Sequence, residues 1–420
     1  MSIKNMMQSF VPKIYFLSLF IIASNVLESI FGEPRPSALS DDTVHFLLSN
    51  GLMAFTIILV YPKYKSVSKL LLSHKRLLGI YLLAAISCSW SPDPVASFRL
   101  IFLPLVLLVG SAYVSLTFTP EQILDLIAKA TALFAVASIV GQVFLSSIEG
   151  TLLQGWTGIY GHRGYLGFGM VLGIAALLVP RSKWGFKRAC MLLLLFLLLL
   201  LSRSATATVS AAMVLAVVFF WKLPPLVRLV SPVVAAIAIV LVVWTSNVDR
   251  VLQQLFNVLG RDSTITGRDV IWHWVSDQIP GHAILGYGFR GFWAPHEDIV
   301  IGALGWNPGH SHNGFLDITL TLGLVGLLML LAILWDGVAR GWRVLARYSD
   351  LAGTWLLMMI WLEMLNNLTG VDYMVPTAPS WTVFTIAYFS CTLAERKHFS
   401  ARAEKGESIE FSENKLLRSG

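Results

Sequence analysis

The strongest constraint on this chain is a series of long apolar stretches that recurs along most of its length. The run from Met191 to Leu201 carries no polar side chain. Only 13% of the 420 residues are charged, against about 25% in an average soluble domain. So few charges cannot cover the surface of a water-soluble fold of this size, and lipid must surround most of the chain. The sequence therefore predicts an all-α integral membrane protein.

The apolar stretches are long enough to act as spanning helices, since crossing a bilayer takes about 20 mostly apolar residues. We predict twelve such helices. They lie at residues 12–30, 44–61, 77–91, 99–117, 122–146, 165–180, 189–202, 204–222, 227–245, 313–335, 351–368 and 378–394. The seventh and eighth meet at Ser202-Arg203-Ser204, which indicates a break between two helices.

These helices divide the chain into four parts. Residues 1–245 hold the first nine helices, residues 246–312 form one large loop, and residues 313–394 hold the last three helices. The tail at 395–420 is polar and mixed in charge, so we expect it to be disordered. Long loops are uncommon unless they have a function, which makes 246–312 the first place to look for a site.

Lysine and arginine predict the orientation, because they are enriched on the cytoplasmic side of membrane proteins. With twelve spans both termini share one side, and that side carries most of these residues, including the cluster at 62–76. We therefore expect cytoplasmic termini and a periplasmic loop. Either arginine is simply tolerated on the outer side, or it binds anions there, because a guanidinium grips phosphate oxygens in a bidentate fork. All basic residues on the outer side are arginines: Arg35, Arg99, Arg163, Arg203, Arg250, Arg261, Arg268 and Arg290.

The clearest local motif closes the large loop, at Gly309-His-Ser-His-Asn-Gly-Phe-Leu316. Ser311 or Asn313 can cap the helix that follows. His312 would then lie beside the N-terminus of that helix, at the membrane surface. A histidine in this place can act as a base toward a sugar hydroxyl or hold a phosphate. The alternative is a purely structural capping segment.

Five further motifs carry outer-side arginines or lie beside one. Thr266-Gly-Arg268 precedes a predicted short helix at 269–278, and Gly286-Tyr-Gly-Phe-Arg-Gly291 predicts a tight turn that presents Arg290. Arg203 occupies a helix junction, where a charge is usually functional or paired, unless it snorkels to the interface. Gly161-His-Arg-Gly164 is as consistent with an ordinary anchor at the membrane interface as with a role in a site. Trp90-Ser-Pro-Asp-Pro94 with Arg99 predicts a turn that is mostly structural.

Absent patterns exclude several classes of function. The chain has no Gly-x-x-x-x-Gly-Lys-Ser/Thr loop, so nothing indicates an ATP-driven pump. It has no Asp-x-Asp pair and no His-Glu-x-x-His, and His310-x-His312 alone does not make a metal site. We therefore expect no metal and no other cofactor. The net charge of +7 falls in short clusters between apolar segments, which indicates topology and not nucleic-acid binding.

Together these motifs resemble the O-antigen ligase and polymerase family of bacterial envelope proteins, and most of all its exopolysaccharide-polymerase branch. The resemblance extends over about residues 80–335. It is carried by Trp90-Ser-Pro-Asp-Pro, Ser202-Arg-Ser-Ala, Thr266-Gly-Arg-Asp-Val-Ile-Trp, Leu285-Gly-Tyr-Gly-Phe and Ser311-His-Asn-Gly-Phe-Leu. It implies a GT-C-like helical glycosyltransferase in the bacterial inner membrane, with a metal-independent site that faces the periplasm.

The resemblance also implies substrates and site residues. The donor would be a glycan on a polyprenyl diphosphate, and the acceptor a second glycan or lipid A-core. The essential Arg and His of the family map onto Arg203, Arg268 and His312, joined by Arg290. Arg163 stands where the family often has Lys, although Gly164 replaces the Asn that often follows. The secondary candidates are His310, Asn313, His162 and Arg99.

These assignments predict an inverting glycosyl transfer. The arginines would bind the diphosphate and stabilise its charge as it leaves. His312 would accept the proton of the attacking hydroxyl, position that hydroxyl, or contact the diphosphate. A polymerase and a ligase share this chemistry and differ in acceptor, and the Gly-Tyr-Gly-Phe element favours a polymerase. A lipid or sugar transporter is an alternative of another class, but the chain shows no convincing internal repeat.

Overall fold

The computed structural model describes residues 3–24, 26, 43–145, 155–180, 185–222 and 268–404, and no strand occurs among them. The longer helices are α1 (Ile3–Ala23), α3 (Thr43–Val60), α4 (Tyr64–Leu72), α5 (Lys75–Ser87), α6 (Pro94–Thr117), α7 (Pro120–Leu145), α9 (Arg163–Leu178), α10 (Phe186–Leu201), α11 (Ala205–Lys222), α14 (Arg268–Gln278), α15 (Glu297–Leu304), α16 (Gly314–Tyr348), α17 (Leu351–Asn367) and α18 (Pro379–Glu404). Short 3-10 turns are η1 (Tyr61–Lys63), η2 (Cys88–Trp90), η3 (Gly158–Tyr160) and η4 (Pro280–His282).

A helix occupies each predicted span except 227–245, which lies outside the described residues, as do residues 246–267 of the predicted loop. The break predicted at Ser202-Arg203-Ser204 is confirmed, because α10 ends just before it and α11 begins just after it. Side-chain caps also start several other helices. Asp93 accepts from the N–H of Ala96 at 3.0 Å ahead of α6, for example.

Several helices are long and apolar enough to cross a membrane. Among the described residues, Pro94–Thr117, Pro120–Gln142 and Gly314–Tyr348 meet this condition, and Leu47–Leu72 meets it together with Lys75–Trp90 across a bend of 96°. Large apolar side chains are exposed along α16, with Trp335 at 74%. A surface of this kind needs lipid around it. The architecture fits an integral membrane protein, while the count of twelve spans stays a prediction.

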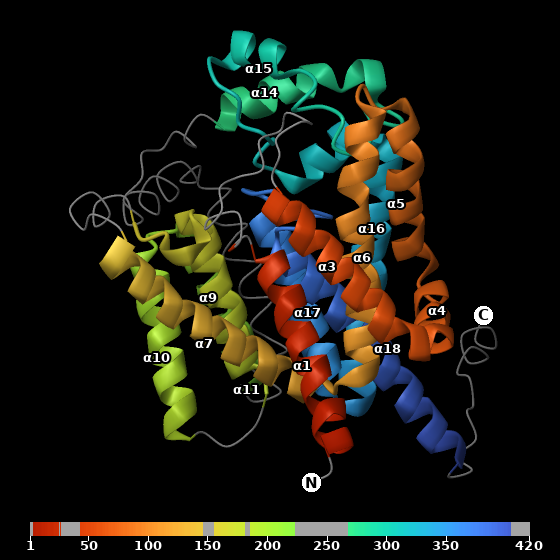
Figure 1. The fold of residues 1–420 in the computed structure, drawn as a ribbon, viewed down its shortest axis with the longest axis vertical. Coiled ribbons are helices and arrows are strands. Elements are labelled where there is room, and N and C mark those ends of the chain that lie inside the picture. The colour runs from red at the N-terminus through yellow and green to blue at the C-terminus, as the bar shows by residue number, and fades with distance from the viewer. Residues whose placement is uncertain are drawn as a thin grey trace, which may run out of the picture.

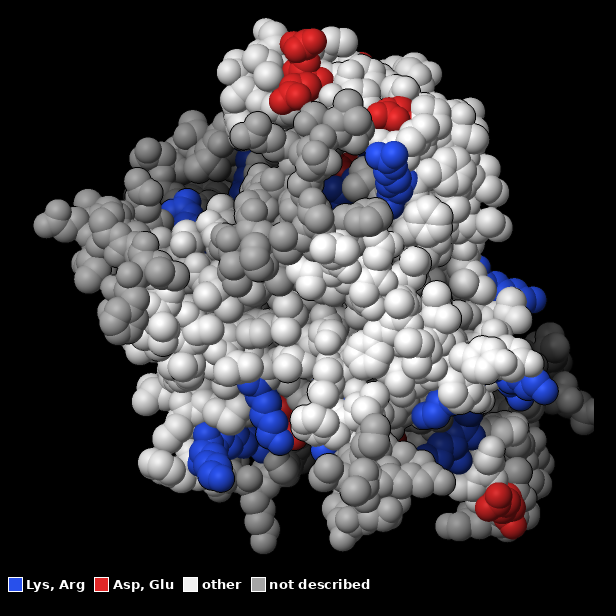
Figure 2. All heavy atoms as spheres, viewed as in Figure 1, with Lys and Arg blue, Asp and Glu red and all other residues white. Residues whose placement is uncertain are grey.

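Charged side chains lie toward the two ends of the molecule. The centre of the face in Figure 2 is white, with many Lys and Arg at the lower end and fewer toward the upper end. In Figure 1, α1 begins and α18 ends at the lower end. This separation of charge is typical of a membrane protein. Which end faces the cytoplasm stays a prediction.

The described residues form two apolar cores of unequal size. The larger core fills the helical bundle and includes Trp355, Phe384 and Leu166. The smaller core lies above the bundle in Figure 1, where α14 and α15 cover it. Its buried members are Ile271, Val275, Phe292, Trp293, Val300 and Leu320. Because Leu320 is on α16, the top of this helix packs with the loop elements, and we call residues 268–322 the upper unit.

Helix α16 is interrupted at Gly323, whose φ of 67° and ψ of −169° are not helical. The segment 283–288 fills the interruption with four backbone hydrogen bonds, which satisfy groups that a helix end leaves unpaired. The bonds are Tyr287 N–H to Leu320 C=O at 3.0 Å, Gly288 N–H to Thr321 C=O at 2.9 Å, Leu324 N–H to Ala283 C=O at 2.8 Å, and Val325 N–H to Ile284 C=O at 3.2 Å. The segment 283–288, which precedes α16 by about thirty residues, therefore supports the helix on both sides of its interruption.

The same segment packs on the turn between α5 and α6. Gly288 has a φ of 91°, and a Cβ there would lie 2.6 Å from the carbonyl oxygen of Ser87. The N–H of Phe289 donates to Ser87 Oγ at 2.9 Å. The predicted tight turn at 286–291 is confirmed, since Gly291 N–H donates to Gly288 C=O at 3.0 Å. Two motifs far apart in sequence therefore fix the base of the upper unit on the bundle.

The prediction that disorder begins at residue 395 is wrong for the first part of the tail. Helix α18 continues to Glu404, and residues 405–420 lie outside the described part. Contacts to α16 and α17 hold the extension: Glu395 pairs with Arg340 at 2.9 Å, and His398 Nε2 lies 2.7 Å from Asp350. Polar composition predicted disorder because it does not reveal such long-range partners.

Candidate functional site

The segment before α16 is a series of tight turns made by side-chain acceptors. Asn313 is the N-cap of α16, and its Oδ1 accepts from the N–H groups of Phe315 and Leu316, both at 3.1 Å. The Nδ1 of His310 accepts in the same way from the N–H of His312 at 3.2 Å. The prediction that Ser311 or Asn313 caps this helix is confirmed for Asn313.

Ser311 anchors the segment between the two histidines. It is fully buried, and its N–H donates to Asp317 Oδ1 at 3.1 Å. Its carbonyl accepts from Trp272 Nε1 at 2.9 Å, while Trp293 Nε1 donates to the same Asp317 oxygen at 3.1 Å. Trp272 lies one helical turn after Arg268, so the bond to Ser311 ties the Arg268 end of α14 to the histidine segment.

Arg268 and Arg290 lie close enough to the histidines to change their titration. Burial, together with the charges of Arg290, Arg268 and His162, lowers the pKa of His310 to about 4. Burial, together with His310, Arg268 and His162, lowers the pKa of His312 to about 3. The two imidazole centroids are 4.1 Å apart. Both histidines are therefore neutral at pH 7, inside a field that favours anions.

Three candidate residues have a left-handed backbone. Arg203 has a φ of 50°, Arg290 of 54° and His312 of 52°. Such conformations are uncommon for residues with a side chain and are often found where a site requires a defined direction. Only two other non-glycine residues in the described part share the feature. Three of the four main candidates from the sequence motifs therefore share this backbone conformation, and Arg268 does not.

The remaining candidates lie at helix ends in the bundle. His162 is the N-cap of α9, with Nδ1 accepting from Gly164 N–H at 3.1 Å, and Arg163 is the first residue of that helix. Helix α9 packs against the junction of α10 and α11, because a Cβ at Gly167 would lie 2.8 Å from Ser202 Oγ. Arg163 and Arg203 therefore belong to adjoining helix ends.

Two contacts connect this group to the start of α16. Thr206, near the start of α11, shares a hydrogen bond with Thr369 after α17, with 2.9 Å between the hydroxyl oxygens. Asn367, at the end of α17, lies so close to Gly314 that a Cβ there would be 2.0 Å from Asn367 Oδ1. The ends of α11, α17 and α16 therefore adjoin at one end of the bundle.

The predicted residues thus fall into two groups that meet. Arg268, Arg290, His310, His312 and Asn313 belong to the upper unit, and His162, Arg163 and Arg203 belong to the bundle. His162 contributes to the lowered pKa of both His310 and His312, which agrees with the two groups lying near each other.

Arg99 differs from the other candidates. It is exposed in the first turns of α6, and its place in the site stays a prediction. Sequence reasoning did not assign site roles to three supporting residues, Trp272, Asp317 and Asn367. Only the position of Asp317, one turn into a capped helix, was readable from the sequence.

Comparison with known proteins agrees with the motifs. Residues 188–331 match the O-antigen ligase family. The exopolysaccharide production protein ExoQ of Rhizobium meliloti (strain 1021) is 25% identical over 299 residues, which cover 66% of this chain and 67% of that protein. A Rickettsia felis protein named as a polysaccharide ligase is 38% identical over 71 residues, covering 16% of this chain and 17% of that protein.

The segment 188–331 is therefore similar to the O-antigen ligase family, and the two relatives agree with that similarity. The range that matches the family includes Arg203, Arg268, Arg290 and His312 but excludes His162, Arg163 and Arg99. It also contains the interruption of α16 at Gly323 and the segment 283–288, whose backbone hydrogen bonds support it. The matched range therefore includes both the upper unit and the helix junction that faces it.

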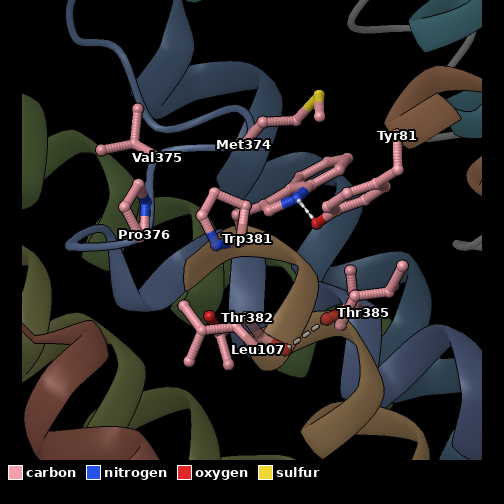
Figure 3. Close-up of a pocket in the computed structure, with 10 residues that line it drawn as sticks. Tyr81, Leu107, Met374, Val375, Pro376, Trp381, Thr382 and Thr385 are labelled. Carbon is pink, nitrogen blue, oxygen red and sulfur yellow. Dashed lines mark hydrogen bonds between the residues drawn. The ribbon is translucent and has the colours of Figure 1, made fainter. Parts of the chain in front are cut away.

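Two cavities lie away from these residues. A small one of about 10 Å³, with room for about one water molecule, is shown in Figure 3 beside Trp381, whose Nε1 donates to the Tyr81 hydroxyl at 2.9 Å. A larger one of about 1380 Å³ lies at the opposite end of α16 from His312, between Asp125, Arg188 and Asp350. Neither contains a predicted site residue.

No group of three or more His, Cys, Asp and Glu side chains within the described ranges could hold a metal ion. The donor set of the candidate site consists of guanidinium groups and imidazoles. Such a set suits an anion better than a divalent cation.

Proposed function

We propose that this protein is a glycosyltransferase that moves a glycan from a polyprenyl diphosphate to an acceptor hydroxyl on the periplasmic face of the inner membrane. The observation that carries the proposal is the meeting of Arg268, Arg290 and two neutral histidines with the helix ends that bear Arg163 and Arg203. The match of residues 188–331 to the O-antigen ligase family supports a membrane enzyme that ligates or polymerises glycans.

Arg203, Arg268 and Arg290 are the proposed diphosphate ligands, with Arg163 beside them. A guanidinium forms two parallel hydrogen bonds to phosphate oxygens, and several of them around one group neutralise its negative charge. The charge grows at the leaving diphosphate as the glycosidic bond breaks, so ligands already in place stabilise the transition state more than the ground state. This arrangement supplies the charge that a divalent ion supplies in other glycosyltransferases.

His312 is the proposed partner of the attacking hydroxyl. Its pKa of about 3 keeps the imidazole unprotonated, so it can accept a hydrogen bond from that hydroxyl. Arrival of the diphosphate adds negative charge near the ring, which raises its pKa toward the value that proton transfer needs. Direct attack of the hydroxyl on the anomeric carbon, opposite the leaving diphosphate, inverts the configuration there.

We assign the protein to polymerisation, with a second lipid-linked glycan as acceptor. The name of the Rhizobium meliloti relative, an exopolysaccharide production protein, supports this choice. The name of the Rickettsia felis relative favours a ligase, in which lipid A-core or a protein would be the acceptor. The two reactions share one donor site and differ only in the group that approaches His312.

A transfer assay on the purified protein in lipid tests this proposal. The reaction contains a polyprenyl-diphosphate glycan and EDTA, and the products are separated by length. We expect a ladder of longer glycans from this donor alone. Product that forms only after addition of lipid A-core or protein would make the enzyme a ligase. If no acceptor yields product and the donor instead crosses the bilayer, the protein is a transporter and the proposal is wrong.

A further inference from the structure

His310 and His312 are joined by a contact that gives them different tasks. The Nδ1 of His310 accepts the backbone N–H of His312 at 3.2 Å. A ring nitrogen that accepts a hydrogen bond carries no proton, so the neutral imidazole of His310 carries its proton on Nε2. The contact therefore fixes the tautomer of His310 and uses the side of its ring that faces the backbone.

The backbone of His312 depends on this contact. Its φ of 52° is left-handed, a conformation that is unfavourable for a residue with a side chain. Its neighbour Ser311 is held by Asp317 and Trp272, and its other neighbour Asn313 is held as the N-cap of α16. Between these two fixed residues, the acceptor on His310 is what holds the N–H of His312 in place.

The direction of the His312 imidazole follows from its backbone. A return of φ to negative values would rotate Cβ and change the direction of the ring, on which the charges of Arg268 and His162 act now. The T-shaped packing of the two rings, with 71° between their planes, supports the same placement from the side.

We propose that His310 is a positioning residue, whose Nδ1 holds the His312 backbone in the left-handed conformation that points the His312 imidazole at the substrate. The inference rests on the proposed function, because it takes His312 to act in glycosyl transfer. It gives His310 a role through the backbone and not through its own proton.

Two substitutions separate the acceptor from the imidazole. The Oδ1 of asparagine occupies the position of Nδ1 in histidine, and the same segment already uses this geometry at Asn307, which accepts from Gly309 N–H at 2.9 Å. The acceptor of glutamine lies instead near the position of Nε2. His310→Asn therefore keeps the bond to the His312 N–H, whereas His310→Gln and His310→Ala lose it.

The test compares glycan transfer by the wild type, His310→Asn, His310→Gln and His310→Ala, each purified in lipid. We expect kcat of His310→Asn within about threefold of the wild type, and kcat of the Gln and Ala variants lower by about 10-fold to 100-fold, as a misplaced catalytic group costs. The KM for the donor should stay within about threefold in all of them. Above about pH 5 the pH profile of His310→Asn should match the wild type, because His310 is already neutral there and asparagine keeps its acceptor.

Two outcomes overturn the inference while leaving the proposed function intact. If the wild type is active and His310→Asn is as poor as His310→Ala, the imidazole itself is needed at the substrate. If His310→Gln keeps wild-type kcat, the bond to the His312 N–H is not needed. Melting temperatures exclude misfolding, and the Asn and Gln pair decides the question if the Ala variant does not fold. A wild type without transfer activity overturns the proposed function and this inference together.

Discussion

Left-handed backbone conformations at Arg203, Arg290 and His312 connect local geometry to the proposed chemistry. Each residue bears a long or planar side chain on a backbone that glycine or asparagine adopts more easily. Such a conformation persists where its neighbours hold it, as the paired helix ends do at Arg203, and as the His310 acceptor and the Ser311 anchor do at His312. At these positions the backbone and the side chain can be tested separately.

The first prediction separates them at Arg203. Arg203→Gly suits the φ of 50° and removes the guanidinium, so the melting temperature should be retained or rise while kcat/KM for the donor falls about 10-fold to 100-fold. Arg203→Val keeps a side chain on the strained backbone and should lower the melting temperature as well. Thermal unfolding and transfer kinetics on the same preparations check both effects. Unchanged transfer by Arg203→Gly would remove Arg203 from the site.

The second prediction concerns pH and the two histidines. The fold lowers the pKa of His310 to about 4 and of His312 to about 3, so it favours their neutral forms. The unfolded chain takes up these protons near pH 6.5, before the fold does, so the histidines remove stability as pH falls from about 6.5 toward 3. Between pH 7.5 and pH 5, the melting temperature of the double variant His310→Asn with His312→Asn should fall less than that of the wild type. Equal losses would contradict the depressed pKa values.

Sequence patterns identified the residues of the proposed site, but they did not identify most of the residues that hold those residues in place. Arg203, Arg268, Arg290 and His312 stand in short motifs whose residue types indicate anion chemistry. The roles of Trp272 and Asn367 depend on contacts across many residues of sequence, to Ser311 and Gly314. Periodicity and local composition carry no information on such contacts.

Among the helices, α16 is the element on which the site depends most. It carries Asp317 above its interruption and lipid-facing side chains such as Leu328 below it. The hydropathy of 313–335 predicted one continuous helix, because Gly323 lies in an unbroken apolar run. The interruption exists because segment 283–288 supplies the backbone partners, and this pairing is not local in sequence.

The third prediction tests this interruption. A Cβ at Gly323 would lie 2.1 Å from the carbonyl oxygen of Ile284, on a backbone with a φ of 67°. Gly323→Ala should therefore lower the free energy of unfolding by about 1 to 3 kcal/mol and loosen the upper unit. Thermal unfolding and hydrogen exchange of 283–288 are the measurements.

Gly51→Ala is the matched control, because it lies in α3 with nothing within 4 Å of the new Cβ and should be neutral or slightly stabilising. If the two variants have equal stability and equal exchange at 283–288, the pairing of this segment with α16 does not hold the upper unit in place.

At the scale of the molecule, the described residues form a large helical bundle and an upper unit with its own small core. The proposed site lies between the bundle and the upper unit, at the end of the bundle toward α14 and α15 in Figure 1. Lys and Arg at the lower end in Figure 2 agree with an upper end that faces the periplasm.

The fourth prediction tests this orientation with single cysteines in a Cys190→Ser background, since the other two native cysteines are buried. Asp298→Cys on α15 should react with a membrane-impermeant maleimide in intact spheroplasts. Arg347→Cys, exposed at the other end of α16, should react only after lysis. The reverse pattern would place the site in the cytoplasm.

The most direct test of the account is equilibrium binding of a polyprenyl diphosphate to the purified protein in lipid. It compares the wild type with Arg203→Gln on the bundle, Arg268→Gln on the upper unit and Arg347→Gln at the far end of α16. If one diphosphate bridges the two units, the first two variants should each weaken binding by about 10-fold to 100-fold, the effect of losing a charge-assisted hydrogen bond, while Arg347→Gln binds like the wild type. Wild-type affinity in Arg203→Gln or Arg268→Gln, or equal weakening in Arg347→Gln, would contradict a diphosphate site shared between the bundle and the upper unit.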